Sequence, residues 1–327
     1  MSTTIPEALL RSIRGGRRFL ITSHINPDGD SIASSLGMAR VLRQLGKSAV
    51  VWMRDAVPPV YSPLPGAARI QVGEEPPVGF PEAFDGVLVM ECPSLDRTGL
   101  AEVLAGAKNL LNIDHHLGNE LYGKANWVDA AAPSAGEMVW RLAQALSLEL
   151  DADGATLLYL TLVTDTGGFR YANATAAAFD AAAHLVRQGA SPERVAAWLY
   201  ESRPEGMIRL LGEMLTTLEL HQEGRVATVS LRREMFRRAN AEDGDAEGLI
   251  NYPRSIAGVE AVALLRELED EGQFKVSLRS RGAVDVAAIA KKHGGGGHVN
   301  AAGCRLEGSE DSLREQMVAE LVTALDS

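Results

Sequence analysis

The stretch FLITSHINPDGDS, residues 19–31, decides how this chain folds. Its first four residues are apolar or β-branched, as in a buried strand, and a turn containing proline and glycine leads into a helical pattern near residues 31–45. A strand, a short turn and a helix form the first half of a βαβ unit, so the stretch predicts a parallel sheet. Ligands of such sheets bind beyond the carboxyl ends of the strands. The polar residues expected there are His24, Asp28 and Asp30. A second interpretation is a turn closed by a helix cap at Asp30 or Ser31.

The same alternation of strand and helix patterns continues through the first half of the chain. Further apolar strand patterns lie at 48–52, 86–91 and 109–114, and helical patterns follow at 134–148, 152–163, 174–188 and 192–201. This order predicts an α/β fold whose N-terminal domain is a parallel sheet with flanking helices.

A second, smaller α/β domain is expected after it, because 327 residues exceed the size at which one core usually keeps growing. After a helical pattern near 204–220, its elements are strand patterns at 225–231, 259–267 and 273–280 and a helix at 310–325. We predict a metal-binding catalytic domain over residues 1–190, a helical connector over 191–215, a substrate-binding domain over 216–327, and an active-site cleft between the domains.

Composition limits the classes of function. The net charge of −11 argues against binding of long duplex nucleic acid, although a few basic residues and bound cations can still hold a small anion. No apolar run approaches the roughly 20 residues that span a bilayer, and the opening residues lack a signal-peptide core. We expect a cytoplasmic protein without membrane attachment. The two isolated cysteines, Cys92 and Cys304, suggest neither a disulfide framework nor a thiolate zinc site.

Three further segments place acidic residues or histidines at the ends of predicted elements. Glu91 ends one strand, Asp114-His115-His116 ends the next, and Asp165 follows the apolar helix at 152–163. Taken alone, Glu91 could be a solvated strand end and Asp165 a buried helix-terminal partner. Two adjacent histidines after a buried strand are costly unless they coordinate or hydrogen-bond something, and this favours a metal site.

The ligand types indicate which metals are expected. Carboxylates with imidazoles and without thiolates suit Mn²⁺, with Mg²⁺ as the alternative. Two such ions could activate water and stabilise an in-line displacement at phosphorus. Four negative charges would balance two divalent cations, and they belong to Asp28, Asp30, Glu91 and Asp165.

A glycine-rich segment near the C-terminus is the candidate anion-binding element. Gly294–Gly297 stand between the basic residues Lys291, Lys292 and His293 and the residues His298 and Asn300. Successive glycines expose backbone N–H groups and admit close approach of a phosphate or a base. A flexible loop without a ligand is the alternative.

Four motifs now resemble those of the DHH phosphoesterase family with its DHH-associated C-terminal domain. They are HINPDGDS, IDHH, VTDTGGFRY and GGGGHVNAAG, in that order along the chain. The resemblance implies two manganese ions held by His24, Asp28, Asp30, His115 and Asp165. Glu91 stands where the family normally has a metal-bridging Asp. The resemblance also implies catalytic roles for His116 and Asp114. The residues implied to contact the substrate are Arg170, Arg279, Ser280, Gly295, Gly296, Gly297, His298 and Asn300.

Within this family the chain is most similar to the stand-alone nano-RNase and pAp phosphatase group. The resemblance implies hydrolysis of very short RNA, of 3′-phosphoadenosine 5′-phosphate (pAp), or of both, by a protein that could form a homodimer. Two alternatives are kept. One is a phosphodiesterase for pApA or cyclic dinucleotides, and the other is a nucleotide-binding sensor whose catalysis is weakened by Glu91.

Overall fold

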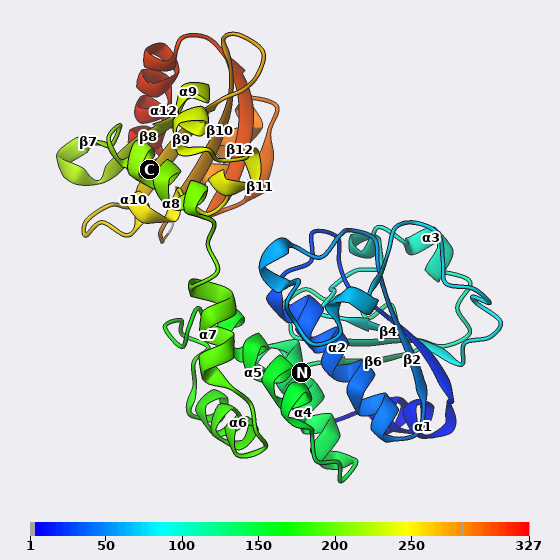
Figure 1. The fold of residues 1–327 in the computed structure, drawn as a ribbon. Helices are drawn as coiled ribbons and strands as arrows, with labels where there is room; N and C mark the ends of the chain where they lie inside the picture. Colours follow the sequence, from blue (N-terminus) through cyan, green and yellow to red (C-terminus); the bar gives the residue numbers. More distant parts are fainter. Residues whose placement is uncertain (1–3, 283, 327) are drawn as a thin grey trace. The chain divides into compact units, whose positions relative to one another are not determined.

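The computed structural model describes residues 4–282 and 284–326, which form two compact units (Figure 1). The first reaches Ser202 and the second begins at Arg203. Helix α7 (Pro192–Tyr200) packs into the first unit through Val195, whereas α8 (Glu205–Leu215) packs into the second through Leu210 and Met214. The stretch 191–215 is therefore divided between the two hydrophobic cores.

The first unit is built on a six-stranded parallel sheet with strand order β3-β2-β1-β4-β5-β6. From β1 the chain proceeds outward to β2 and β3 and then returns to the other side of β1, so the order reverses between β1 and β4. The bounds of the strands are β1 Arg18–Thr22, β2 Ser48–Met53, β3 Gln71–Val72, β4 Gly86–Met90, β5 Leu110–Asp114 and β6 Ala125–Val128.

Both faces of this sheet are buried, which explains why its strands read as continuous apolar runs. Alternate residues of one strand enter two different cores: Phe19 and Ile21 pack with the larger core, and Leu20 packs with a smaller one that contains Trp52. The helices of this unit are α1 Glu7–Gly15, α2 Gly29–Gln44, α3 Ala101–Leu104, α4 Ala135–Ala145, α5 Ala152–Asp165, α6 Ala176–Arg187 and α7.

Helix α2 lies at the centre of the larger core and has almost no exposed face. It begins with a reciprocal cap, in which Asp28 Oδ1 accepts from the Ser31 N–H at 3.0 Å and Ser31 Oγ accepts from the Asp28 N–H at 2.9 Å. Glycines allow its neighbours to come close. A Cβ on Gly37 would overlap Leu158 of α5, and one on Gly136 of α4 would overlap Thr161 of α5.

The second unit contains a mixed six-stranded sheet with the order β11-β12-β10-β9-β8-β7, antiparallel except between β8 and β9. Its strands are β7 Glu219–His221, β8 Val226–Leu231, β9 Ala261–Glu267, β10 Gln273–Ser280, β11 Gly296–His298 and β12 Ala301–Glu307. Helices cover both faces, and they are α8, α9 Arg233–Ala239, α10 Asn251–Arg254, α11 Val286–Lys292 and α12 Glu310–Leu325.

Short 3₁₀ helices complete the structure at Pro59–Tyr61, Ala67–Arg69, Asp96–Thr98, Gln222–Gly224 and Asp243–Ala246. Among the helices of residues 4–282 and 284–326, none is long and apolar enough to cross a membrane.

The predicted α/β fold, with a parallel first sheet and a second α/β region, is confirmed. Three details differ from the sequence patterns. Helix α2 begins at Gly29, so Asp30 lies inside its first turn. Strands β3, β6, β7 and β12 were not expected, and neither was β11, which forms within the glycine run. Glycine is disfavoured inside strands, so its pattern predicts a loop.

Replacing Gly136 by Ala should destabilise the first unit by about 1–3 kcal/mol, because the new methyl group would overlap Thr161. All four tryptophans of the chain (Trp52, Trp127, Trp140 and Trp198) belong to this unit, so tryptophan fluorescence during urea unfolding reports on it. The matched control is Gly15→Ala, where a Cβ would meet nothing within 4 Å. Equal unfolding midpoints for the two variants would contradict the close contact of α4 with α5.

Candidate functional site

The candidate site of the first unit lies beyond the carboxyl ends of β1, β4 and β5. His24 follows β1, Glu91 follows β4, and Asp114 ends β5. The strand order reverses between β1 and β4, and this is the position at which open α/β sheets bind their ligands. The connectivity alone therefore brings together three segments that are far apart in the sequence.

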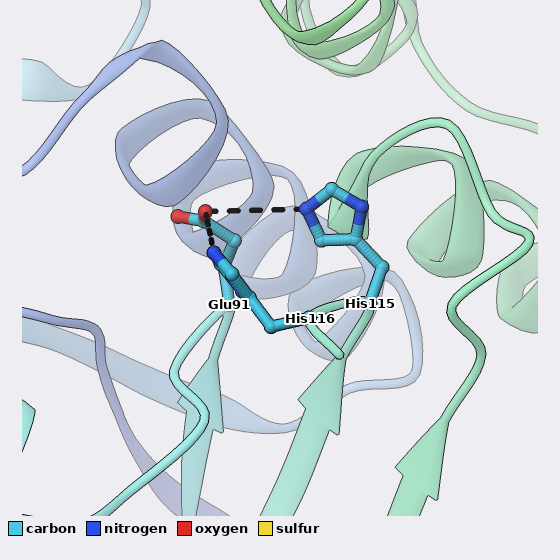
Figure 2. A group of neighbouring side chains, drawn as sticks. All are labelled: Glu91, His115 and His116. Carbon is cyan, nitrogen blue, oxygen red and sulfur yellow. Dashed lines mark ion pairs between the residues drawn. The ribbon is translucent and has the colours of Figure 1, made fainter. Parts of the chain in front are cut away.

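Three imidazoles point their Nε2 atoms toward the carboxylate of Glu91. His24 Nε2 lies 3.0 Å from Glu91 Oε2. His116 Nε2 and His115 Nε2 lie 3.8 and 4.0 Å from Oε1 of the same carboxylate (Figure 2). Glu91 is almost completely buried. Its carboxylate is the centre on which the histidines converge.

The other ring nitrogen of each histidine is held by an oxygen of the chain. His24 Nδ1 lies 2.7 Å from the Ile25 carbonyl, His115 Nδ1 lies 3.2 Å from the Ala132 carbonyl, and His116 Nδ1 lies 2.8 Å from Asp114 Oδ1. A carbonyl can only accept, so Nδ1 of His24 and of His115 carries the donated proton. This tautomer leaves Nε2 available as a ligand, which is the arrangement found in metal-binding histidines.

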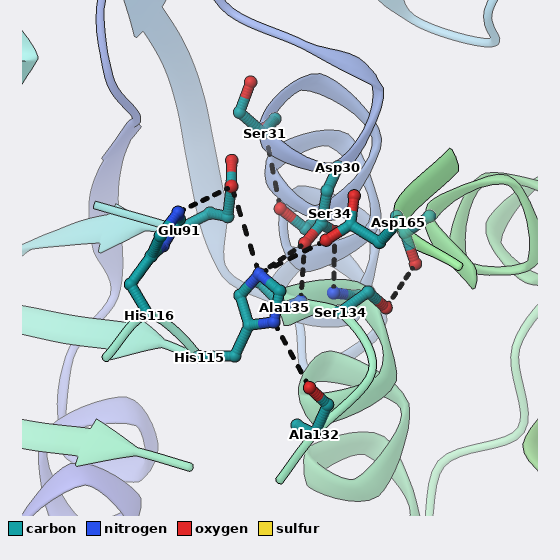
Figure 3. Close-up of polar contacts among 12 residues, drawn as sticks. Asp30, Ser31, Ser34, Glu91, His115, His116, Ala132, Ser134, Ala135 and Asp165 are labelled. Carbon is teal, nitrogen blue, oxygen red and sulfur yellow. Dashed lines mark hydrogen bonds and ion pairs between the residues drawn. The ribbon is translucent and has the colours of Figure 1, made fainter. Parts of the chain in front are cut away.

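Asp30 is fully buried and accepts two backbone hydrogen bonds at the start of α4. The Ala135 N–H donates to Oδ2 at 2.6 Å and the Gly136 N–H to Oδ1 at 3.0 Å (Figure 3). The N-terminus of a helix is a favourable environment for a carboxylate. Ser134 caps the same helix, and its hydroxyl lies 3.0 Å from that of Thr161.

Asp165 and Asp28 complete the group from two helix ends. Asp165, the last residue of α5, lies 3.2 Å from His115 Nε2, which is also 3.6 Å from Asp30 (Figure 3). Asp28 is the exposed N-cap of α2. Within the described residues, the side chains form three sets whose donor atoms lie within 4.8 Å of one another: Glu91, His115 and His116; His24, Asp28 and Glu91; Asp30, His115 and Asp165.

The carboxylates raise one another's pKa. Burial and then the charges of Asp165 and Asp28 raise the pKa of Asp30 well above its usual value, and burial followed by the charge of Asp28 has the same effect on Glu91. Burial and Asp28 raise the pKa of Asp165 to about 8. These acids repel one another when they are ionised, and divalent cations would relieve that repulsion. The donor set, which contains no thiolate, fits the divalent metals expected from the sequence.

Asp114 differs from the other acids because both of its carboxylate oxygens accept hydrogen bonds from neighbouring side chains. Burial tends to raise the pKa of Asp114, but hydrogen bonds from His116 and Asn119 outweigh it and hold the pKa below its usual value. Asn119 Nδ2 donates to Asp114 Oδ2 at 2.6 Å and lies 2.8 Å from Asn112 Oδ1. Asp114 therefore positions the ring of His116. The sequence reasoning missed Asn119 and Asn112, although a buried asparagine within the apolar β5 pattern was a visible signal.

Glu91 has a left-handed backbone, with φ +50°. This conformation is uncommon for residues other than glycine, asparagine and aspartate, and it costs free energy that the surrounding structure must supply. The Glu91 N–H donates to the Ile113 carbonyl at 2.8 Å, which holds the turn after β4 against β5. The turn directs the side chain back toward His24.

The predicted substrate residues of the second unit belong to β10, to β11 and to the segments beside β11, and these strands are joined through β12. Ser280 is buried, donates to the Val284 carbonyl at 2.7 Å and accepts from Asn300 Nδ2 at 2.9 Å. Both side chains thus hold the turn after β10. Burial, and then the charge of Arg254, lower the pKa of Arg279.

The glycine run packs closely against β12. A Cβ on Gly295 would lie 2.6 Å from the Cβ of Cys304, and one on Gly297 would lie 2.6 Å from the Cα of Ala302, whereas Gly296 faces open space. The side chain of His298 lies outside the described part of the structure. In the first unit Arg170 is exposed, and its Nε donates to the Gly167 carbonyl at 2.5 Å. The structure thus brings the predicted metal-binding and catalytic residues together, and it leaves Arg170 without a described contact to them.

Comparisons with known proteins agree with this arrangement. Residues 18–162 match the "DHH family, N-terminal domain" and residues 223–327 match the "DHHA1 domain". Two curated relatives carry the name bifunctional oligoribonuclease and PAP phosphatase NrnA. The protein of Thermus thermophilus is 34% identical over 96% of this chain and 91% of its own length, and that of Bacillus subtilis is 26% identical over 96% and 97%.

A solved structure is also similar over nearly the whole chain. It is that of an exopolyphosphatase-related protein from Bacteroides fragilis, with a TM-score of 0.87 and 26% identity over 99% of this chain and 98% of that one. The family resemblance expected from the four motifs is confirmed. The chain therefore belongs to the DHH family of phosphoesterases and carries a DHHA1 domain after its DHH N-terminal domain.

Proposed function

We propose that this chain is a metal-dependent phosphoesterase that hydrolyses very short oligoribonucleotides and pAp to mononucleotides. The observation that carries the proposal is the convergence of three Nε2 atoms on the buried carboxylate of Glu91. The names of the two curated relatives support the substrates, because both include an oligoribonuclease and a PAP phosphatase activity.

Two divalent cations would be held by the grouped side chains, and we propose Mn²⁺ with Mg²⁺ as the alternative. His24 and Asp28 would hold one ion, Asp30, His115 and Asp165 would hold the other, and Glu91 would contact both. When bound, such ions activate water and stabilise the charge that develops on a phosphoryl group. The negative charges of these side chains need that compensation.

The residues of the chain contribute orientation and a proton. Hydrolysis forms a bond between the oxygen of water and phosphorus, breaks the bond from phosphorus to the leaving oxygen, and returns a proton to that oxygen. His116 is the most exposed of the three imidazoles, and its Nδ1 is fixed by Asp114. We assign it the delivery of the proton from Nε2, with Asp114 stabilising the charged ring.

The second unit would hold the end of the substrate that does not react. Arg279 is half-buried and carries a positive charge, and Gly296 exposes backbone that a phosphate or base can approach. Ser280 and Asn300 would shape this surface through their mutual hydrogen bond, with His298 and the neighbouring glycines at its edge. A grip at a fixed place would limit the length of the substrate.

A nucleotide-binding sensor with weak catalysis is the second candidate. The observation in its favour is Glu91, a side chain one methylene longer than the Asp expected from the family motif, on a left-handed backbone. Misplacement of a reacting group by about 1 Å can lower a rate by about a hundredfold.

His115→Ala should abolish hydrolysis of pAp and of RNA dimers in the presence of Mn²⁺. The substitution removes the only imidazole that lies within 4 Å of three carboxylates among the described residues. Steady-state assays measure the loss, and circular dichroism checks the fold. His221→Ala, whose ring contacts Thr228 in the second unit, is the matched control and should retain activity. Unchanged turnover by His115→Ala would falsify the proposed site.

Glu91→Asp decides between the enzyme and the sensor. For an enzyme, wild-type protein hydrolyses pAp, and the variant changes kcat by less than about a hundredfold because the charge is kept and aspartate tolerates the left-handed backbone. For a sensor, wild-type protein binds pAp without turnover and the variant gains activity by orders of magnitude. Both proteins are assayed after metal removal and addition of Mn²⁺ or Mg²⁺.

The metal-free first unit should lose thermal stability as the pH rises from about 4 to about 8. The raised pKa of Asp165, about 8, means that the folded state retains a proton that the unfolded chain has lost, so stability falls across this window. Melting followed by tryptophan fluorescence gives the slope, and Asp165→Asn should reduce it. Mn²⁺ should raise the melting temperature more at about pH 8 than at about pH 5, since bound metal requires ionised ligands. A flat or rising profile without metal would contradict the clustering of charged acids.

A further inference from the structure

A second cavity of the first unit lies on a different face of α5 from the candidate metal site. Thr161 and Asp165, which are four residues apart, face α4 and Asp30. The cavity is bordered by Tyr159 and Val163, which have the same spacing and lie on another face of the helix. Its volume is about 440 Å³. The cavity is lined by Tyr159 and Val163 of α5, Phe169 and Arg170 of the following turn, and Val195 and Tyr200 of α7.

The aromatic rings of this cavity differ in how they are held. The ring of Phe169 lies between Tyr159, at 6.3 Å between centroids, and Phe179, which stacks on it at 5.0 Å and 25°. The ring of Tyr200 is 51% exposed. An exposed ring beside fixed ones is the arrangement on which proteins stack unpaired bases, because every base offers a flat π-face.

The turn that carries Phe169 is strained. Gly167, Gly168 and Phe169 all have left-handed backbones, with φ of +59°, +70° and +60°. Glycine accepts this conformation, but phenylalanine does so at a cost, and such strain concentrates at ligand sites. A Cβ on Gly168 would lie 3.3 Å from the Tyr200 hydroxyl, so the glycine leaves the space that Tyr200 occupies.

Tyr61 connects the cavity to the candidate metal site. Burial, and then the charges of Asp28 and Asp165, raise the pKa of Tyr61 to about 12, and Tyr200 adds to the effect. The hydroxyl of Tyr61 lies 3.0 Å from the place of a Cβ on Gly29, which follows Asp28. Tyr61 also ends the 3₁₀ helix Pro59–Tyr61, which contacts α7, so it lies near both Asp28 and the helix that carries Tyr200.

Arg170 supplies a positive charge at the edge of the cavity. Its Nε donates to the Gly167 carbonyl, and no acidic side chain of residues 4–282 and 284–326 forms an ion pair with it. The outer nitrogens of the guanidinium group remain available for a phosphate, to which arginine donates two parallel hydrogen bonds.

We propose that this cavity receives the base of a nucleotide whose phosphate lies at the metal site, with Tyr200 stacked on the base and Arg170 bound to a phosphate. The inference rests on the proposed function and adds a base-binding subsite to it within the first unit. Stacking tolerates every base, so the subsite selects for a nucleoside and leaves its sequence open.

Tyr200→Ala and Tyr200→Phe test the subsite with a matched pair of substrates. The pair is pAp and ribose 3,5-bisphosphate, which carries the same phosphates and no base. Tyr200→Ala should raise KM for pAp about tenfold or more and leave KM for the sugar bisphosphate unchanged, whereas Tyr200→Phe should behave as wild type because it keeps the ring. Equal changes of KM for the two substrates would overturn the proposal. Because Tyr200 is exposed, we expect neither substitution to impair folding, and the fluorescence of the neighbouring Trp198 checks that the fold is kept.

A binding measurement separates this inference from the proposed function. Calorimetry with Mn²⁺-loaded full-length protein compares AMP with ribose 5-phosphate and requires no turnover. AMP should bind more tightly, and Tyr200→Ala should remove most of the difference, even if the chain proves unable to hydrolyse pAp. If the advantage of AMP persists in Tyr200→Ala, or if AMP has no advantage in the wild type, the base lies elsewhere and the subsite is rejected.

Discussion

The buried carboxylate of Asp30 is the constraint on which the candidate site depends. A charge with no exposed surface is costly unless it is compensated, and the Ala135 and Gly136 N–H groups at the start of α4 supply only part of the compensation, because burial still raises the pKa of Asp30. The same helix start leaves no room for a side chain between Gly136 and Thr161. Packing of α2, α4 and α5 and the position of the acid are therefore one feature, and a change in one would displace the other.

The sequence predicted those parts of the site that follow apolar strands. His24, Glu91 and Asp114 lie at the carboxyl ends of β1, β4 and β5, and each strand can be recognised in the sequence because both faces of the sheet are buried. The partners of Asp30 could not be read in this way, because backbone N–H groups have no side-chain signature. The left-handed backbone of Glu91 was equally hidden, since a glutamate at a strand end predicts no particular turn.

The second unit shows how packing and recognition compete for the same residues. Ser280 and Asn300 were expected at a substrate, and they hydrogen-bond each other across the β10 and β12 ends. The glycine run was expected as a loop, and half of it pairs as β11. Gly295, just before this strand, and Gly297, within it, fit only because they lack a Cβ. Composition alone does not distinguish a glycine needed for close backbone packing from one needed for a ligand. Gly296 faces open space, so it is the position where the glycine can serve the approach of a ligand.

The strand order of the first sheet has a consequence for how the protein is made. Side chains from His24 to Asp165 meet at one point, so nearly the whole first unit must leave the ribosome and fold before the acids are brought together. Contacts of such large sequence separation form late and slowly, because the closure of long loops opposes them. A partly folded chain thus lacks the clustered acids that could hold a metal ion. Metal retention would then distinguish finished molecules from incomplete ones during synthesis.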